Sequence, residues 1–218
     1  MTLDLFGEED LQQPARVERI CTQTFVLRGF ALPWAEALLT ALNTLLIQSP
    51  FRHMQTPGGF TMSARLSSCG DLGWTSDSNG YRYSAIDPLS AAPWPRMPAA
   101  FLAVAEAAAS AAGFKGFVPD AGLINTYAPG AKMSLHQDKN ERDYDAPIVS
   151  ISLGLPAIFQ FGGFERSDPA QRISLFHGDV VVWGGLDRLR FHGVLPIKPG
   201  QHPVLGEQRI NITLRKAG

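Results

Sequence analysis

Cysteine is scarce in this chain, which has two among 218 residues, Cys21 and Cys69. Two distant cysteines make no disulfide framework, and free thiols are typical of proteins in a reducing compartment. No apolar run reaches the roughly 20 residues that a membrane-spanning helix needs. Residues Met1 to Glu9 also lack the basic and apolar segments of a secretory signal. These absences predict a cytoplasmic location and no contact with a membrane.

Neither sign of charge is in large excess, because the net charge is −1. The chain therefore does not have the strongly basic composition of many nucleic-acid-binding proteins. A local basic rim would still be enough to contact phosphates. The candidates for such a rim are Arg65, Arg82, Lys132, Lys139, Arg142 and Arg166. Scattered basic residues are equally typical of a solvated surface, so charge alone leaves both interpretations open.

Helical patterns come early in the chain and strand patterns come later. Pro33 to Gln48 carries one apolar stripe behind a proline that suits a first helical turn. Pro98 to Ala112 is alanine-rich and is followed by a glycine, as helix ends often are. From Ala121 onward, short alternating segments separated by turn residues predict strands. The sequence predicts one domain, 1–218, mainly β with α, in which helices cover one face of an antiparallel jelly roll whose core is 121–218.

The segment around His136 carries the strongest chemical signal. His136 and Asp138 are two residues apart, so an extended backbone places both side chains on one face. With His192 they supply two imidazoles and a carboxylate, the ligand set of a facial triad that leaves iron positions open for a co-substrate and dioxygen. An isolated His-x-Asp pair is more often the cap of a turn. His177 is the rival to His192 by position.

The last strand supports the metal interpretation. In Arg209 to Arg215, three apolar residues alternate with Arg209, Asn211, Thr213 and Arg215. This polar face could be solvated, as in many half-buried strands. It could also be the wall of a pocket with two guanidinium groups, which suits a dicarboxylate. Asn125 and Tyr127 share one face of another predicted strand, Ala121 to Tyr127, and add an amide and a phenol to a polar patch.

These residues belong to an ordered set of motifs that covers nearly the whole chain. The set contains Asn125-x-Tyr127-x-Pro129-Gly130, His136-x-Asp138, His192, Arg209-x-Asn211-x-x-x-Arg215, Thr56 to Gly59, Gly73-Trp74, Ser150 to Gly154, Phe159 to Gly163 and Gly178 to Gly185. Through this set of motifs the chain resembles the AlkB family of iron- and 2-oxoglutarate-dependent dioxygenases. The resemblance is greater to its bacterial DNA-repair members than to its RNA- or protein-directed members.

The resemblance implies a double-stranded β-helix that uses Fe(II), 2-oxoglutarate and O2. It implies that His136, Asp138 and His192 bind the metal and, with Arg215, form the catalytic group. Arg209, helped by Tyr127, would bind the far carboxylate of 2-oxoglutarate, and Arg215 and Asn125 would hold the carboxylate nearer the iron. Asn211 and Thr213 would line the same site.

Residues 56–95 are predicted to form a lid that recognises the nucleotide. This stretch has little apolar periodicity and is rich in glycine and aromatic residues, including Trp74, Tyr81, Tyr83 and Trp94. A surface insertion anchored by its aromatic residues is the alternative. The resemblance implies that Trp74 and His136 sandwich a flipped base and that Tyr81 and Arg166 hold flanking phosphate or sugar. The predicted substrate-binding residues are Trp74, Tyr81, Arg82, Tyr83, Asn140 and Arg166.

The function implied is repair of alkylation damage by oxidative demethylation of bases such as 1-methyladenine and 3-methylcytosine. The substrate would be alkylated single-stranded DNA, with RNA or a base flipped out of a duplex as further substrates, and the enzyme would be a monomer. The products would be formaldehyde, succinate and CO2. A 2-oxoglutarate-dependent hydroxylase of a small molecule is the alternative with the same chemistry. A non-catalytic jelly-roll binding module is the alternative of another class, but it would have no need of the metal and diacid residues.

Asn140 departs from the family pattern. The bacterial repair enzymes that the chain resembles carry an aspartate there, which is thought to meet the exocyclic amine of the alkylated base. An amide brings donors and no charge, so we expect weaker discrimination in favour of cationic lesions and relatively better use of neutral lesions. Phe60 and Leu66 stand where those enzymes have tyrosine and methionine, and they could reshape the same pocket.

Overall fold

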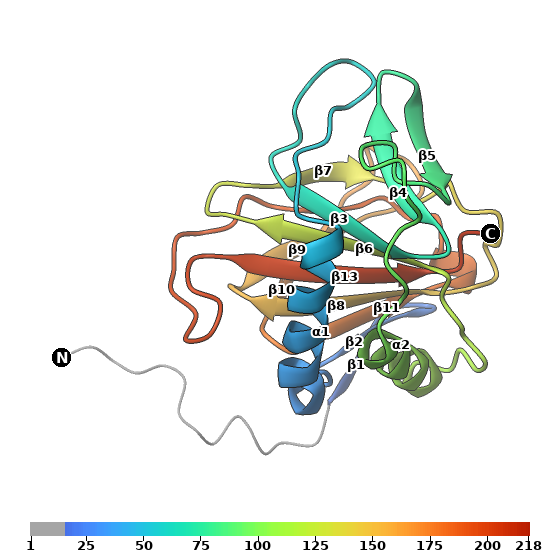
Figure 1. Cartoon of the computed structure of the whole chain (residues 1–218). Helices are drawn as coiled ribbons and strands as arrows, with labels where there is room; N and C mark the ends of the chain where they lie inside the picture. Colours follow the sequence, from blue (N-terminus) through green and yellow to red (C-terminus); the bar gives the residue numbers. More distant parts are fainter. Residues whose placement is uncertain (1–15) are drawn as a thin grey trace.

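A computed structural model of the chain describes residues 16–218 and is built around two antiparallel sheets (Figure 1). The larger sheet has seven strands in the order β1-β2-β11-β8-β13-β6-β3. Their bounds are β1 Val17–Cys21, β2 Thr24–Leu27, β11 Val180–Trp183, β8 Ile148–Gly154, β13 Arg209–Arg215, β6 Ala121–Tyr127 and β3 Arg65–Gly70. The predicted strands Ala121 to Tyr127 and Arg209 to Arg215 are confirmed, and they pair along their whole length.

The smaller sheet has four strands in the order β10-β9-β12-β7. Their bounds are β10 Gln171–Leu175, β9 Ala157–Phe161, β12 His192–Val194 and β7 Met133–His136. A separate hairpin of β4 (Gly73–Asp77) and β5 (Gly80–Ser84) stands at the upper right of Figure 1, beyond the β3 edge of the larger sheet. The two facing sheets confirm the predicted jelly roll.

Two helices cover the outer face of the larger sheet (Figure 1). Helix α1 spans Ala35–Gln48 behind a 3-10 turn, Leu32–Trp34, and α2 spans Ala99–Ala111. The α1 stripe of Leu38, Leu42 and Leu45 is buried in the same apolar cluster as α2 and the apolar faces of β8, β11 and β13. Packing of this kind, rather than helix propensity, provides most of the stability of such helices. The two predicted helices and their covering position are confirmed. In the part of the chain that the structure describes, no helix has the length and apolar character needed to cross a membrane.

The space between the sheets is apolar at one end and polar in the middle. Val26, Phe159, Phe161, Val181 and Trp183 form part of an apolar cluster between β2 and β11 of the larger sheet and β9 of the smaller one. The polar face of β13 lies in the same interior, and its predicted alternation holds because its apolar face joins the helix-side cluster. This polar face is buried rather than solvated, which decides between the two interpretations of its pattern.

Some boundaries differ from those expected from the sequence. Strand β3 lies inside the range 56–95, yet it is the edge strand of the larger sheet and pairs with β6. Because β1, β2 and β3 belong to that sheet, the sheet extends beyond the range 121–218. Trp94 is buried, donates its indole N–H to the Ser84 carbonyl and packs against Gly73, so it anchors the segment and is not an exposed recognition group.

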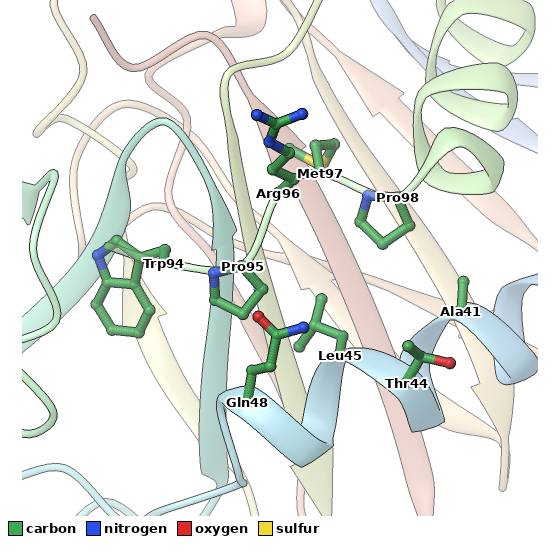
Figure 2. A pocket seen from close by; sticks show the side chains of 9 residues that line it. All are labelled: Ala41, Thr44, Leu45, Gln48, Trp94, Pro95, Arg96, Met97 and Pro98. Atoms are coloured by element: carbon green, nitrogen blue, oxygen red, sulfur yellow. The ribbon is translucent and has the colours of Figure 1, made fainter. Parts of the chain in front are cut away.

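A cavity of about 490 Å³ lies between α1 and the segment Trp94 to Pro98 (Figure 2). Its lining includes Thr44 and Gln48 from the helix, with Arg96 and Met97 opposite. None of the predicted metal or diacid residues contributes to it. The cavity is therefore a feature of the helix-covered side of the molecule and separate from the predicted site.

Candidate functional site

The three predicted metal ligands come together between the sheets. His136 ends β7 and His192 begins β12, and the two residues are directly paired across these strands, with ring centroids 4.5 Å apart. Asp138 follows β7 by two residues. Its carboxylate oxygens lie 3.8 Å from His136 Nε2 and 3.5 Å from His192 Nε2. Among the described residues this is the one such group, with its ligand atoms all within 4.8 Å of one another.

The histidine rings are oriented for metal binding. His136 Nδ1 donates to the Ser134 carbonyl at 2.9 Å, and His192 Nδ1 donates to the Arg190 carbonyl at 3.0 Å. A carbonyl can only accept, so each neutral ring keeps its lone pair on Nε2, the atom that faces Asp138. Burial and the neighbouring His192 ring lower the pKa of His136 to about 4, which favours the neutral form, although one edge of the His136 side chain remains open to solvent.

Asp138 is held ionised by its neighbours. Burial alone would raise its pKa, but the Arg215 guanidinium outweighs that effect and holds the pKa well below its usual value. Arg215 donates to Asp138 Oδ2 through Nη2 at 2.7 Å and Nε at 3.2 Å. Burial would lower the pKa of Arg215, and the Asp138 carboxylate raises it instead. A carboxylate ligand is thus present in the charged form that a cation needs.

Arg209 is a buried cation with no anion beside it. Its guanidinium donates to Ser152 Oγ at 2.8 Å and to the Leu155 carbonyl at 3.4 Å, while Nε finds no partner in the described part of the chain. Over residues 16–218 no carboxylate lies within ion-pair distance of it, and burial lowers its pKa to about 10. A buried charge is normally paired. The carboxylate of a small diacid would supply the missing partner.

Asn125 and Tyr127 lie beside the two arginines on the neighbouring strand. Tyr127 is paired with Arg209, and Asn125 with Asn211, across β6 and β13. Among residues 16–218 the buried side-chain oxygen of Asn125 has no hydrogen-bond partner. Burial raises the pKa of Tyr127 to about 12, so its hydroxyl stays a donor. The Tyr127 hydroxyl can donate to a bound diacid, and Asn125 can do so through its amide N–H groups, because a carboxylate only accepts.

Asn211 and Thr213 are engaged within the sheet. Asn211 Nδ2 donates to Ser150 Oγ at 2.7 Å and to the Ile151 carbonyl at 3.1 Å, and the Thr213 hydroxyl donates to Asn211 Oδ1 at 2.9 Å. These bonds fix the polar wall between the two arginines. Direct contact of either residue with a co-substrate stays a prediction.

Trp74, Tyr81 and Arg82, three of the predicted substrate-binding residues, lie on the β4–β5 hairpin. Trp74 and Tyr81 stack on one another across the β4–β5 hairpin, with centroids 5.6 Å apart and an interplanar angle of 18°. Arg82 is paired with Asp77 at 2.7 Å within the same hairpin. Asn140 is exposed just past the metal motif.

Two further predicted residues reach toward the metal motif. Arg166 donates to the Leu135 carbonyl and covers the Phe191 ring, so it rests against β7. Tyr83 points inward and donates its hydroxyl to Glu141 Oε1 at 2.7 Å. The contacts of these residues with nucleic acid stay predictions.

Two buried charged residues beside the metal ligands were missed by sequence reasoning. Glu141 lies three residues after Asp138 and pairs with Arg188 at 3.2 Å, and both side chains are 2% exposed. Arg188 also donates to the main-chain carbonyl of Asp138 at 2.7 Å. The closeness of Glu141 to the His-x-Asp motif was the one available signal.

The other histidines lie away from the triad. His177 accepts a hydrogen bond from the Gly154 amide at 3.0 Å and lies against His202, with ring centroids 4.5 Å apart. His53 bonds to the Met62 carbonyl. His177 therefore does not face His136 and Asp138, whereas His192 does, in agreement with the choice of His192 from the sequence.

Comparisons with known proteins agree with this geometry. A family model described as the 2OG-Fe(II) oxygenase superfamily matches residues 23–215. The chain is 56% identical to "Alpha-ketoglutarate-dependent dioxygenase AlkB" of Salmonella typhimurium, over 99% of this chain and 98% of that protein. It is 55% identical to the Escherichia coli protein of the same name, over the same shares of each chain. A solved structure titled "The structure of OsALKBH1" aligns with a TM-score of 0.79 at 27% identity, over 92% of this chain and all of that one.

Proposed function

The chain belongs to the AlkB family within the 2OG-Fe(II) oxygenase superfamily, and from that premise we propose that it removes methyl groups oxidatively from N-alkylated nucleobases. The observation that carries the proposal is the triad of His136, Asp138 and His192 beside a buried arginine, Arg209, that lacks an anion. A binding module would have no use for this combination. The relatives named AlkB are dioxygenases, which supports the same chemistry here.

Each part of the site has a separate task in this proposal. Fe(II) with 2-oxoglutarate supplies the activation of O2 and the oxidation of the methyl group, with release of succinate, CO2 and formaldehyde. His136, Asp138 and His192 hold the metal. Arg209 pairs with the far carboxylate of the co-substrate, and Tyr127 stands beside it.

The remaining residues of the site bind the near carboxylate of 2-oxoglutarate and the alkylated base. Arg215 and Asn125 hold the near carboxylate of 2-oxoglutarate. We propose that recognition of the base belongs to the β4–β5 hairpin and the loop of residues 56–64, with Trp74 stacking on the base. Tyr81, Arg82, Tyr83, Asn140 and Arg166 surround it. The apolar walls between the sheets, such as Phe159 and Trp183, exclude water from the reacting group.

We propose alkylated single-stranded DNA as the substrate, with RNA or a flipped duplex base as further substrates of the same chemistry. A base must leave its stack before its methyl group can reach a buried metal. A cytoplasmic location and a monomeric state complete the proposal. A small-molecule hydroxylase would share the interior but would have no need of an aromatic hairpin at the rim.

The test is release of formaldehyde from oligonucleotides that carry 1-methyladenine, in the presence of iron, ascorbate and 2-oxoglutarate. We expect the wild type to restore adenine, as read by mass spectrometry of the oligonucleotide. His192→Ala should be inactive, whereas His53→Ala, which alters a histidine outside the triad, should remain active. Turnover of 2-oxoglutarate without any change in a panel of methylated oligonucleotides would favour the small-molecule hydroxylase.

A further inference from the structure

A cluster of buried charge includes the metal ligand Asp138. It consists of the carboxylates of Asp138 and Glu141 and the guanidinium groups of Arg188 and Arg215. The side chains of Glu141 and Arg188 are 2% exposed, and that of Arg215 is 6% exposed. Burying charge is unfavourable unless each group is paired, so the arrangement of these four groups needs a reason.

Arg215 has two carboxylates within reach. Its Nη2 lies 2.7 Å from Asp138 Oδ2, and its Nε lies 3.5 Å from Glu141 Oε1. The shorter contact goes to the metal ligand. Glu141 has two other neighbours: Arg188 Nη2 lies at ion-pair distance from Oε2, 3.2 Å, without a hydrogen bond to it, and the Tyr83 hydroxyl donates to Oε1 at 2.7 Å.

Arg188 also fixes the backbone of the metal motif. Its Nη1 donates to the Asp138 carbonyl at 2.7 Å, and its guanidinium lies over the Tyr144 ring at 5.5 Å. Gln137 Nε2 donates to the Leu189 carbonyl at 2.7 Å. The segment that carries Asp138 is therefore attached at two consecutive residues to the loop that leads into His192.

We propose that Arg188 is a positioning residue for the metal centre. Its positive charge neutralises Glu141, so that Arg215 pairs with Asp138 and with the near carboxylate of the co-substrate. It also holds the Asp138 backbone against the His192 loop. The inference rests on the proposed function for the identity of the metal and co-substrate, but its effect is on binding and requires no nucleic acid.

The primary test is titration of the metal-free protein with Mn(II), followed by electron paramagnetic resonance. Loss of a group that orients a metal ligand typically weakens metal binding or activity roughly 10- to 100-fold, and we expect this range for Arg188→Met. Arg188→Lys keeps the charge beside Glu141 and should retain most of the affinity. Arg52→Met is the matched control, because Arg52 also pairs with a buried carboxylate, Asp87, and neither residue touches the triad.

A second substitution separates charge balance from general loss of structure. In the Arg188→Met background, Glu141→Gln removes the unpaired carboxylate and should restore most of the affinity for Mn(II). The charge-transfer absorption of the anaerobic Fe(II) protein with 2-oxoglutarate should weaken in the single variant and recover in the double variant. Thermal melts of all variants report folding. If Arg188→Met does not fold, Arg188→Gln replaces it, because it removes the charge and keeps a hydrogen-bond donor.

Three results would overturn the proposal. One is wild-type Mn(II) affinity in folded Arg188→Met. The second is an equal loss of affinity in Arg52→Met. The third is a loss in Arg188→Met that Glu141→Gln does not reduce. A wild-type protein that binds Mn(II) and 2-oxoglutarate but releases no formaldehyde from methylated oligonucleotides would refute the proposed function and leave this inference standing.

Discussion

The interior between the sheets and the β4–β5 hairpin differ in how they hold charged and aromatic groups. In the interior, Asp138 and Arg215 form a buried pair, and the side chain of Arg215 is 6% exposed. In the hairpin, Asp77 and Arg82 form a pair at the same distance of 2.7 Å, but their side chains are 36% and 37% exposed. Solvent screens the second pair and hardly screens the first.

The difference teaches where chemistry and recognition reside in this molecule. The interior arginines, Arg209 and Arg215, lie on β13, which is paired on both sides, with β6 and β8. The hairpin is a two-stranded unit whose aromatic stack lies at the surface. A substitution in the interior should therefore abolish a step of the reaction, whereas a substitution in the hairpin should alter the affinity for the substrate or the choice of substrate.

The largest effect is expected from Asp138→Ala. This removes one of three metal ligands, and we expect turnover to fall below detection and metal affinity to fall by more than the roughly 100-fold typical of supporting residues. The measurements are formaldehyde release and Mn(II) titration, with circular dichroism to show that the protein is folded. Asp77→Ala removes the hairpin carboxylate and should leave metal binding unchanged. Full activity in Asp138→Ala would refute the triad.

Arg209→Ala should have the next largest effect. Removal of one partner of a buried ion pair costs roughly 3–5 kcal/mol, so the KM for 2-oxoglutarate should rise at least about 100-fold. 2-Oxoglutarate should raise the melting temperature of the wild type and not that of the variant. Arg172→Ala, on the exposed face of β10, is the control. An unchanged KM would mean that the far carboxylate binds elsewhere.

Trp74→Ala tests the hairpin. Stacking of a base on an aromatic ring is worth about 1–3 kcal/mol, so affinity for methylated single-stranded DNA should fall roughly tenfold to a hundredfold. Turnover of 2-oxoglutarate without nucleic acid should survive. Trp74 also packs against Met54, Leu66 and Leu123, so a structural role is the competing explanation. If both measurements fall together, that explanation holds, and Phe176→Ala shows the effect of removing an exposed ring elsewhere.

The smallest effect is expected from Asn140→Asp, which changes a single exposed group. Hydrogen bonds to charged groups are worth about 1.5–3 kcal/mol and neutral ones about 1, so the change should be modest. We expect the wild type to use neutral lesions such as 1-methylguanine or 3-methylthymine relatively well. The variant should shift the ratio of kcat/KM values toward 1-methyladenine over 3-methylthymine. If that ratio does not shift, Asn140 does not determine which lesions the enzyme prefers.

Much of the fold and the metal site could be predicted because the local sequence patterns match the environments of the same residues in the folded structure. The alternation in Arg209 to Arg215 is strict because each face of β13 has a different neighbour: the apolar face packs under the helices, and the polar face lines the interior between the sheets. The His136–Asp138 spacing fixes two ligands on one strand end. His192 could be assigned only through the resemblance, because nothing local distinguishes it from His177.

Strand β3 and the buried pair Glu141–Arg188 could not be predicted, for different reasons. In β3, Ser67 and Ser68 are buried because their hydroxyls bond to the carbonyls of Ser49 and Trp74, and such polar burial leaves no hydrophobic pattern. Glu141 and Arg188 are far apart in sequence and look like solvated loop residues. Each of the two side chains can be buried because the other neutralises its charge. The sequence around one residue does not reveal a partner that is distant in the chain.

The direct pairing of His136 with His192 limits how this protein can change in length. One residue inserted into or deleted from β7 or β12 would turn one ring to the opposite face of the smaller sheet and dismantle the triad. The exposed connection of residues 198–201 has no such restriction. Insertions, deletions and engineered fusions that preserve the enzyme are therefore expected to concentrate in loops of this kind, while the two histidine strands keep a fixed length.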